Sequence, residues 1–414
     1  MENIKKLDFN YSLKDIPLTN KKEYTIKLYD AASKFINRLR WKIFFINNEN
    51  VDINEQKEED IFKSTRSAPA CDELKNFEID LFKLLESIKF TNYRSRFQKN
   101  LKIDLKNILT KNKIILFADK TRNLYQTNPK FYKKLVIDNL TKNYKISNTN
   151  LIETINADSE IIILDRKIKN KKIPKYTKSD AFITIKDHKP KFPFETECRT
   201  LNPGKNQLGL LSKVILEKIV NDIRRKSGLT QWKNSYEVLE WFNNIDNIKN
   251  KCFVNFDIVN FYPSIKHEHL TEAIKFAKNY TEIENKDIKL IEHTCKTIIT
   301  YDNRTWIKKD NDNQFDVPMG SFFGAELCDL IGLYALSKLK HLYNHKDIGL
   351  YRDDGLAIIN IKSNQELEKL KKNTIKTFNK LGFKITIDIG TTKCNFLDIS
   401  LDTSNNIFKP YQKI

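Results

Sequence analysis

The sequence predicts an α+β fold, in which an antiparallel sheet is backed by helices and follows a helical N-terminal extension. The first 110 residues are rich in apolar side chains at helical spacing. Further along the chain, two apolar runs flank a short turn bracketed by Gly349 and Gly355, which is typical of a tight β-hairpin. A third apolar run predicts a buried strand that ends at Asp257. Apolar helical segments lie between these strands and predict the helices that cover the sheet.

The N-terminal extension has helical periodicity but carries no chemistry of its own. Residues 24–45 and 72–90 place apolar side chains at spacings near 3.6, and residues 92–109 predict a further, basic helix. The polar and acidic segment 47–59 predicts an exposed loop or linker. We therefore expect accessory helices in this region.

The charge of the chain indicates a polyanionic partner. The 414 residues carry a net charge of +20, and 16 Tyr with 26 Phe supply side chains on which bases can stack. A hydrophobic content of 40% excludes a wholly disordered chain. We therefore expect a nucleic acid as the partner, and no membrane.

Cysteine usage and the N-terminus bear on the compartment. The six cysteines occur singly, without metal-ligand spacing, which is typical of reduced thiols. The first residues lack the apolar core of a signal peptide, and no apolar run approaches membrane-spanning length. We expect an intracellular protein, nuclear or cytoplasmic and not secreted, and the oligomeric state stays open.

A basic hairpin is predicted between residues 181 and 203. One strand runs into a turn that contains Lys186 and Lys189, and the returning strand carries Arg199. The three cations would converge on a single anion. Triphosphate is the natural candidate, because Arg can fork onto phosphate oxygens while Lys acts as a point charge.

Two other basic segments have more than one interpretation. A buried strand upstream ends at Asp119 and Lys120, where a solvated loop is as good an explanation as a functional one. The lysine-dense segment 167–178 is either a solvated loop, a contact to a nucleic-acid backbone or a nuclear import signal.

Three carboxylates mark the predicted centre of the sheet. Asp353 and Asp354 lie at the tip of the hairpin, and Asp257 ends a neighbouring strand. Adjacent anions repel, so such a pair is ordinarily found in a solvated loop. Between strands this apolar they need compensating cations, and a divalent metal is the usual one. Three carboxylates on two neighbouring strands are what a two-metal phosphoryl-transfer site requires.

In this order, the segments resemble the fingers-and-palm core of reverse transcriptases. Residues 256–264 resemble motif A of that family, and four shorter segments resemble the motifs that follow it. These are Pro318-Met319-Gly320-Ser321 for motif B, Tyr351-Arg352-Asp353-Asp354 for motif C, Leu381-Gly382-Phe383-Lys384 for motif D and Asn395-Phe396-Leu397-Asp398 for the primer-grip motif E.

Within the family the chain is most similar to the Penelope-like retroelement branch. The resemblance covers residues 114–411 and rests on four segments, one of which contains Arg352 between Tyr351 and the two aspartates. The segments are Ala118-Asp119-Lys120-Thr121, Ile185-Lys186-Asp187-His188-Lys189-Pro190, Tyr351-Arg352-Asp353-Asp354-Gly355-Leu356 and Asn395-Phe396-Leu397-Asp398-Ile399-Ser400-Leu401.

The resemblance implies a right-hand polymerase fold with fingers and palm. We expect a helical N-terminal extension over residues 1–110, fingers over 111–250, a palm over 251–393, and a primer-grip hairpin with the truncated start of a thumb over 394–414. Complete elements of the branch continue into a helical thumb and, in many members, a GIY-YIG endonuclease. We therefore expect a truncated copy that lacks both.

The resemblance also implies a role for each matching residue. Two Mg²⁺ ions per site, or Mn²⁺ in their place, would be held by three catalytic aspartates, and a lysine would donate a proton to pyrophosphate. Met319 stands where retroviral enzymes have Gln, which changes hydrogen bonding to the nucleotide at that point. The catalytic residues are Asp257, Asp353, Asp354 and Lys384, the dNTP-binding residues are Lys186, Lys189, Arg199, Met319, Gly320 and the steric gate Tyr262, and the template and primer residues are Lys120, Asn395, Phe396 and Leu397.

The implied activity is RNA-directed DNA polymerisation, with an RNA template, a DNA primer and dNTPs as partners. Three alternatives stay open. One is a weak or inactive nucleic-acid-binding remnant of a reverse transcriptase. Another is an RNA-dependent RNA polymerase, although these enzymes more typically have Gly-Asp-Asp in motif C and a second Asp at the place of Tyr262. The last is a metal nuclease, which would leave the basic hairpin without a role.

Overall fold

The fold is described from a computed structural model of the chain. Contacts between residues divide the chain into two compact units. The first unit comprises Met1–Asn139 and Ile183–Arg199, and the second comprises Leu140–Phe182 and Thr200–Ile414. Residues 48–59 of the predicted loop, almost all of the predicted helix 92–109 and the lysine-dense segment after Lys167 lie outside the described residues, while Asn47 ends α1. The structure describes residues 4–7, 21–47, 71–90, 103, 106, 113–121, 123–147, 151–167, 179–204, 207–309, 314–360 and 363–411.

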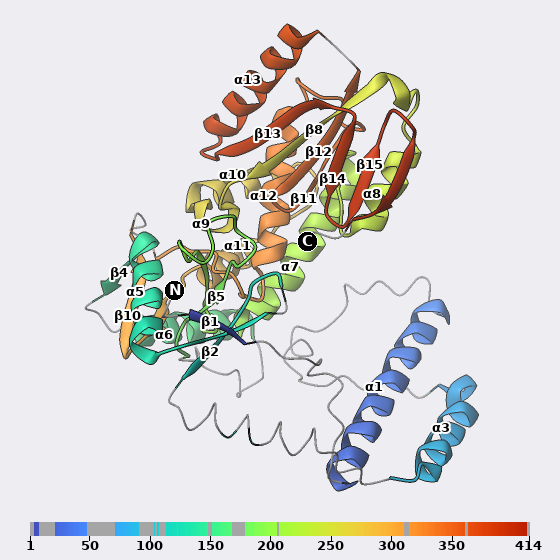
Figure 1. Cartoon of the computed structure of the whole chain (residues 1–414), viewed down its shortest axis with the longest axis vertical. Helices are drawn as coiled ribbons and strands as arrows, with labels where there is room; N and C mark the ends of the chain where they lie inside the picture. The colour runs from blue at the N-terminus through green and yellow to red at the C-terminus, as the bar shows by residue number, and fades with distance from the viewer. Residues whose placement is uncertain are drawn as a thin grey trace. The chain divides into compact units, whose positions relative to one another are not determined.

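The first unit contains the N-terminal helices, a small sheet and the basic hairpin (Figure 1). The predicted helices 24–45 and 72–90 are confirmed as α1 and α3, which pack through an Arg40–Glu78 ion pair and a stacked Tyr29–Phe82 pair. The sheet has the order β1-β3-β2, and β5 pairs with β6. The elements are β1 (Ile4–Leu7), α1 (Lys21–Asn47), α3 (Lys75–Ser87), β2 (Ile114–Phe117), β3 (Leu124–Thr127), α5 (Pro129–Asn143), β5 (Phe182–Ile185) and β6 (Cys198–Leu201).

The second unit is built on a five-stranded sheet with the order β13-β8-β12-β11-β7. The predicted hairpin is confirmed as β11 and β12, and the strand that ends near Asp257 is confirmed as β8. Every pairing in this sheet is antiparallel except that of β11 with the two-residue strand β7. The strands are β7 (Thr230–Gln231), β8 (Lys251–Ile258), β11 (Ile348–Tyr351), β12 (Asp354–Asn360) and β13 (Ile385–Thr391).

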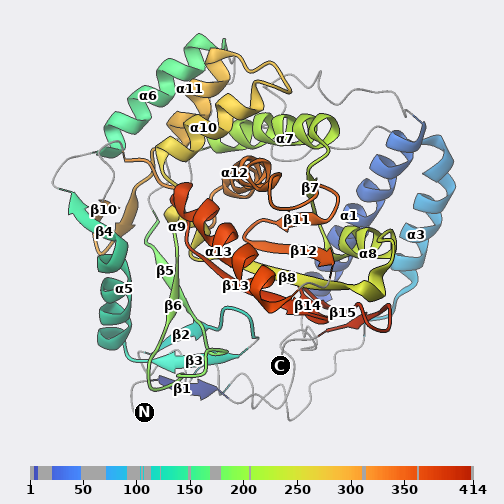
Figure 2. The same ribbon diagram turned by 90° about the horizontal axis from the view of Figure 1, so that it is seen from above.

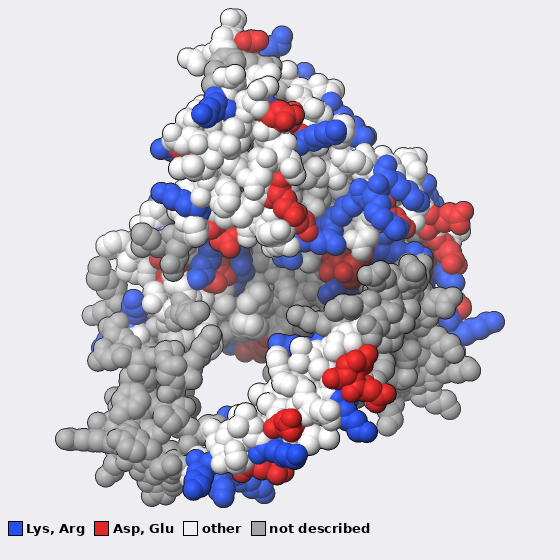
Figure 3. All heavy atoms as spheres, turned by 90° about the vertical axis from the view of Figure 1, so that its right-hand side faces the viewer, with Lys and Arg blue, Asp and Glu red and all other residues white. Residues whose placement is uncertain are grey.

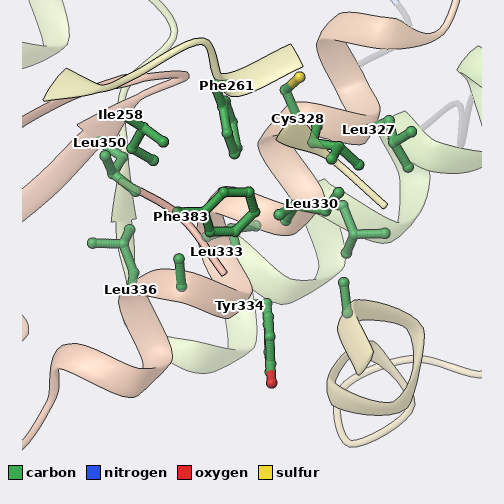
Figure 4. Packing of buried hydrophobic residues seen from close by; sticks show 14 of the residues in the cluster. Ile258, Phe261, Leu327, Cys328, Leu330, Leu333, Tyr334, Leu336, Leu350 and Phe383 are labelled. Atoms are coloured by element: carbon green, nitrogen blue, oxygen red, sulfur yellow. The ribbon is translucent and has the colours of Figure 1, made fainter. Parts of the chain in front are cut away.

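One face of this sheet is covered by helices around the almost wholly buried α12. Figure 2 shows α12 end-on between the sheet and α7, with α10 beside it. Side chains from the sheet and from the helices close this core, as Figure 4 shows for Ile258, Leu350, Leu330 and Leu333. The helices are α7 (Leu208–Ser227), α10 (His267–Ala277), α11 (Asn285–Thr294), α12 (Gly324–Leu339) and α13 (Asn364–Lys380).

A second core covers the opposite face of the sheet. Phe253 and Leu356 of the sheet pack there with Trp232, Phe242 and Phe396. The predicted C-terminal hairpin is present and gains a strand, because β14, β15 and β16 form a three-stranded sheet. The elements are α8 (Ser235–Asn243), β14 (Lys393–Phe396), β15 (Ile399–Asp402) and β16 (Ile407–Pro410).

The remaining elements of the second unit are a three-stranded sheet and the helices α6 and α9. The strands β9 and β10 form a hairpin, and β4 pairs with β10 to give a sheet of order β4-β10-β9. The α+β class is therefore confirmed. Over the described part of the chain, no helix has both the length and the apolar character needed to cross a membrane. The elements are β4 (Tyr144–Ser147), α6 (Leu151–Asp165), α9 (Phe261–Ser264), β9 (Ile299–Tyr301) and β10 (Arg304–Lys308).

Candidate active site

Two of the three predicted carboxylates face each other across neighbouring strands. Asp257 near the end of β8 is paired in register with Asp354 at the start of β12, so both side chains lie on one face of the sheet. Like charges directly opposite on a sheet repel and destabilise the pairing. Asp353 directly precedes Asp354, in the two-residue turn from β11 to β12. The sheet therefore collects negative charge at one end, which suits a bound cation.

The turn itself is held in a restricted backbone conformation. Arg352 has a backbone φ of +55°, a value that residues other than Gly rarely adopt. The backbone N–H of Ile258 donates a hydrogen bond of 2.9 Å to the carbonyl oxygen of Asp353. The guanidinium of Arg352 lies 5.6 Å from the centre of the Tyr351 ring, within the range of a cation–π contact. The position of Asp353 is thus fixed by the backbone of β8 as well as by its own hairpin.

The two glycines that bracket the turn are required by close packing. A Cβ atom on Gly355 would lie 2.1 Å from the Phe256 ring, and one on Gly349 would lie 2.6 Å from the Trp232 ring. Both distances are far below van der Waals contact. The glycines therefore allow large aromatic side chains to support the hairpin from both faces of the sheet.

The carboxylates fit a metal that is shared with a substrate better than a closed protein cage. Among the described residues, no group of three or more His, Cys, Asp or Glu side chains is arranged to hold a metal ion. Mg²⁺ is usually bound by one or two carboxylates together with substrate phosphates and water. The facing pair Asp257 and Asp354, with Asp353 beside them, meets that requirement.

Tyr262 lies next to the carboxylate turn, five residues after Asp257. It belongs to the short helix α9, and its hydroxyl shares a hydrogen bond with the buried thiol of Cys328. Burial raises the pKa of Tyr262 well above its usual value, and the nearby Cys328 adds to this effect. Arg352 and Asp353 are close enough to act on the same hydroxyl. The neighbouring Phe261 packs edge-on against Phe383, 5.4 Å between ring centres (Figure 4).

Met319 and Gly320 lie in the loop before α12, and Gly320 has φ +98°. The start of this loop is anchored by Asp316, which is 1% exposed. The Tyr144 hydroxyl donates a hydrogen bond of 2.7 Å to one oxygen of Asp316, and the Lys308 ammonium lies 3.1 Å from the other. Met319 is half-buried and Gly320 is exposed.

Lys384 and the primer-grip residues lie at other points of the second unit. Lys384 is exposed just before β13, and its carbonyl oxygen accepts a hydrogen bond of 2.9 Å from Val259 N–H, two residues after Asp257. Asn395 is exposed on β14, and Leu397 forms the following turn with φ +54°. The Phe396 side chain is only 2% exposed, because it packs against Trp232 in the second core. It supports the β14–β15 turn from beneath.

The predicted basic hairpin is present in the first unit. Lys186 follows β5 and is half-buried, and its pKa is lowered by burial and by the nearby charges of Arg199 and Lys189. Lys186 is therefore close enough to both Arg199 and Lys189 to be repelled by their charges. Arg199 is not left to an anionic ligand alone, since its Nη1 lies 2.9 Å from Asp119 Oδ1. The exposed Lys120 follows Asp119 directly.

Sequence reasoning missed a charged pocket beside the turn. A cavity of about 170 Å³ is lined by Tyr351, Arg352 and several charged residues of the helices, including Arg224 and Asp329. Arg224 Nη2 lies 3.7 Å from Asp329 Oδ2, and burial raises the pKa of Asp329 to about 6. One signal was available in the sequence, namely an acidic residue within the apolar run that forms α12.

Comparisons with known proteins support the polymerase fold. No protein-family model matches the chain, and no curated protein matches it by sequence. Its structure is similar to apo telomerase from Candida tropicalis, with a TM-score of 0.52, 13% identity, and coverage of 96% of this chain and 68% of the other. The same enzyme truncated from its C-terminal domain gives a TM-score of 0.50 at 14% identity, and the match covers 96% of this chain and 91% of the other.

A third structure, telomerase from Candida albicans in complex with a fragment of telomeric RNA, gives a TM-score of 0.51 at 10% identity and covers 82% of this chain and 60% of the other. Identities this low establish the fold and not the activity. The chain accordingly has the α+β fingers-and-palm fold of a reverse transcriptase-like polymerase.

Proposed function

We propose that this chain is an RNA-directed DNA polymerase of a retroelement, most similar to the Penelope-like branch. The observation that carries the proposal is the β8–β12 register, which pairs Asp257 with Asp354 and sets Asp353 in the adjoining turn. Tyr262 beside this turn and the fold shared with telomerase support it. Further support comes from the net charge of +20 and from a cluster of Lys and Arg side chains that Figure 3 shows with Asp and Glu side chains beside it.

The proposal divides the chain by role. Residues 111–250 are the fingers, residues 251–393 are the palm, and the β14–β15 region is the primer grip. Two Mg²⁺ ions, or Mn²⁺ in their place, supply activation of the primer 3′-hydroxyl and neutralise the pyrophosphate leaving group when bound. Asp257, Asp353 and Asp354 are the residues that would hold them. An RNA template, a DNA primer and dNTPs are the partners, in the nucleus or cytoplasm.

The other residues bind and orient the substrates. Tyr262 rejects a ribose 2′-hydroxyl, and Met319 with Gly320 lies beneath the incoming nucleotide. Lys384 donates a proton to the leaving pyrophosphate. The triphosphate is bound by Lys186, Lys189 and Arg199, and the template and primer by Lys120, Asn395 and Leu397 above the buried Phe396.

Primer extension on an RNA template tests the proposal. We expect Mg²⁺-dependent incorporation of dNTPs that is lost on chelation and reduced at least roughly 100-fold by Asp353→Asn. The matched control is Asp388→Asn, which neutralises an exposed carboxylate of β13 two residues further along the same face. The control should retain activity within about twofold.

Two outcomes would contradict the proposal. Binding of RNA without extension in either metal would instead support an inactive nucleic-acid-binding remnant. Extension with rNTPs in preference to dNTPs would support an RNA-dependent RNA polymerase.

A further inference from the structure

We propose that Asp187 is a positioning residue, whose carboxylate holds the basic connection between β5 and β6 ready for the phosphates of the incoming nucleotide. The inference rests on the proposed function, and it deepens the description of the anion site. Asp187 lies between Lys186 and Lys189, two of the lysines of that connection. It does not itself bind an anion, because it is negatively charged.

Three side chains from another part of the first unit converge on one oxygen of Asp187. Oδ2 accepts hydrogen bonds from the Thr121 hydroxyl at 2.6 Å, the Asn123 amide at 2.8 Å and the Tyr125 hydroxyl at 2.9 Å. Thr121 is 66 positions earlier in the chain. Hydrogen bonds to an ionised acceptor are stronger than those between neutral groups. The connection is therefore attached to the β2–β3 turn by a charge-assisted cluster.

Tyr125 attaches the same connection at a second point. It is 5% exposed, and its ring packs edge-on against Phe192, 5.3 Å between ring centres. Backbone bonds add to this attachment, because Asp119 N–H donates to Ile185 O at 2.8 Å. One tyrosine thus restrains both Asp187 and Phe192, and the turn that carries Lys189 lies between them.

The cations need such a restraint, because they repel one another. The pKa of Lys186 is lowered by burial and by the charges of Arg199 and Lys189. Burial alone would favour the neutral form of Asp187, but the hydrogen bonds from Thr121, Asn123 and Tyr125 hold its pKa below the usual value. Asp187 therefore stays ionised, and its attachment persists at neutral pH.

The substitution Asp187→Asn separates positioning from simple electrostatics, because the two predict opposite signs. If Asp187 were only a negative charge near the cations, its neutralisation would tighten anion binding. If it positions the lysines, its neutralisation weakens anion binding, since an amide oxygen cannot hold three donors as strongly.

The measurement is made on the full chain with inorganic triphosphate as the probe, by titration calorimetry, and with dNTP in primer extension. For Asp187→Asn we expect the triphosphate Kd and the dNTP KM to rise about tenfold, with kcat within about twofold of the original. Tyr125→Phe removes one donor and should weaken binding less. The double variant should lose less than the sum of the two, because both substitutions break the same cluster.

The matched control is Glu195→Gln. Glu195 is a carboxylate on the same connection, paired at 3.0 Å with Lys191 but exposed to solvent. Its neutralisation should leave triphosphate binding unchanged or slightly tighter.

Unchanged or tighter triphosphate binding by Asp187→Asn would overturn the inference, as would a loss of thermal stability without any change in Kd. Failure of the proposed function is distinct from this. A chain that binds triphosphate in an Asp187-dependent way but extends no primer leaves the inference standing and removes the polymerase assignment.

Discussion

The molecule gathers like charges in two places and restrains them by different means. At the end of the central sheet, Asp257 and Asp354 are held by backbone pairing between β8 and β12, with a buried core on each face. In the first unit, Lys186 follows the four-residue strand β5, and Arg199 is part of the four-residue strand β6. The position of Arg199 depends on its ion pair with the carboxylate of Asp119. Neutralising a charge at the sheet end should therefore change chemistry, whereas removing a counter-ion from the basic hairpin should change structure.

The largest expected effect tests the sheet end. Asp257→Asn should reduce primer extension at least roughly 100-fold. The free energy of unfolding should stay the same or rise by up to about 1 kcal/mol, because the repulsion with Asp354 is relieved. Primer extension and urea denaturation on the same preparation measure both quantities. A large loss of stability would show that the backbone pairing of β8 with β12 is not sufficient to hold this end of the sheet, and that the Asp257 side chain contributes.

A second test concerns Asp329, which lines the charged pocket beside the turn between β11 and β12. The pKa of Asp329 is about 6 in the fold, against an ordinary value of 3.8, so the folded state binds more protons than the unfolded chain. Its contribution to stability is full below about pH 4 and is lost as the pH rises through about 6. At pH 7.5, Asp329→Asn should raise the free energy of unfolding by about 2–3 kcal/mol.

The same variant sharpens the comparison. If the backbone pairing of β8 with β12 positions the turn, Asp329→Asn should retain primer-extension activity within about fivefold. The substitution nevertheless changes the surroundings of Arg352 and Arg224. Denaturation curves at pH 5 and pH 7.5 should differ less for the variant than for the original chain. Equal pH dependence in both would contradict the assignment of this titration to Asp329.

Neutralising a carboxylate of the basic hairpin region should lower the free energy of unfolding, in contrast to the substitutions of Asp257 and Asp329. Asp119→Asn removes the partner of Arg199, whose side chain is 36% exposed while that of Asp119 is 6% exposed. We expect the free energy of unfolding to fall by about 1–2 kcal/mol and the dNTP KM to rise. Thermal melts together with steady-state kinetics check this. An increase in stability would remove the distinction between the two regions.

The smallest expected effect concerns nucleotide choice. Tyr262→Ala should raise the use of rNTPs relative to dNTPs about tenfold, because the side chain beside the turn no longer excludes a 2′-hydroxyl. Competition between the two nucleotides in primer extension measures this ratio. An unchanged ratio would take the gate role away from Tyr262 while leaving the carboxylate site untouched.

Local signals account for what the sequence predicted. The β11–β12 hairpin was predictable because glycines, apolar runs and a tight turn occur within a few residues of Asp353. The helices α7, α12 and α13 were predictable from long apolar periodicity. In contrast, α6 and α11 were missed, although both are well-formed helices in the structure.

Contacts between distant segments could not be predicted. Asp119 pairs with Arg199 only because β2 and β5 are brought together by the bridge from Ala118 to Ile185. The strand β7 has two residues and is defined by its parallel pairing with β11, more than a hundred positions later. Short segments of this kind have no periodicity of their own, so tertiary contacts decide their conformation.

Trp232 gives the site a built-in optical probe. Its indole lies against Gly349 of the hairpin, and its backbone N–H donates a hydrogen bond of 2.8 Å to Leu350 O. Trp241 is its edge-on neighbour, 5.2 Å between ring centres. Two indoles this close couple their electronic transitions, so the near-ultraviolet circular dichroism of the pair depends on their mutual orientation. A displacement of the hairpin when nucleic acid or nucleotide binds would therefore change a spectroscopic signal that needs no added label.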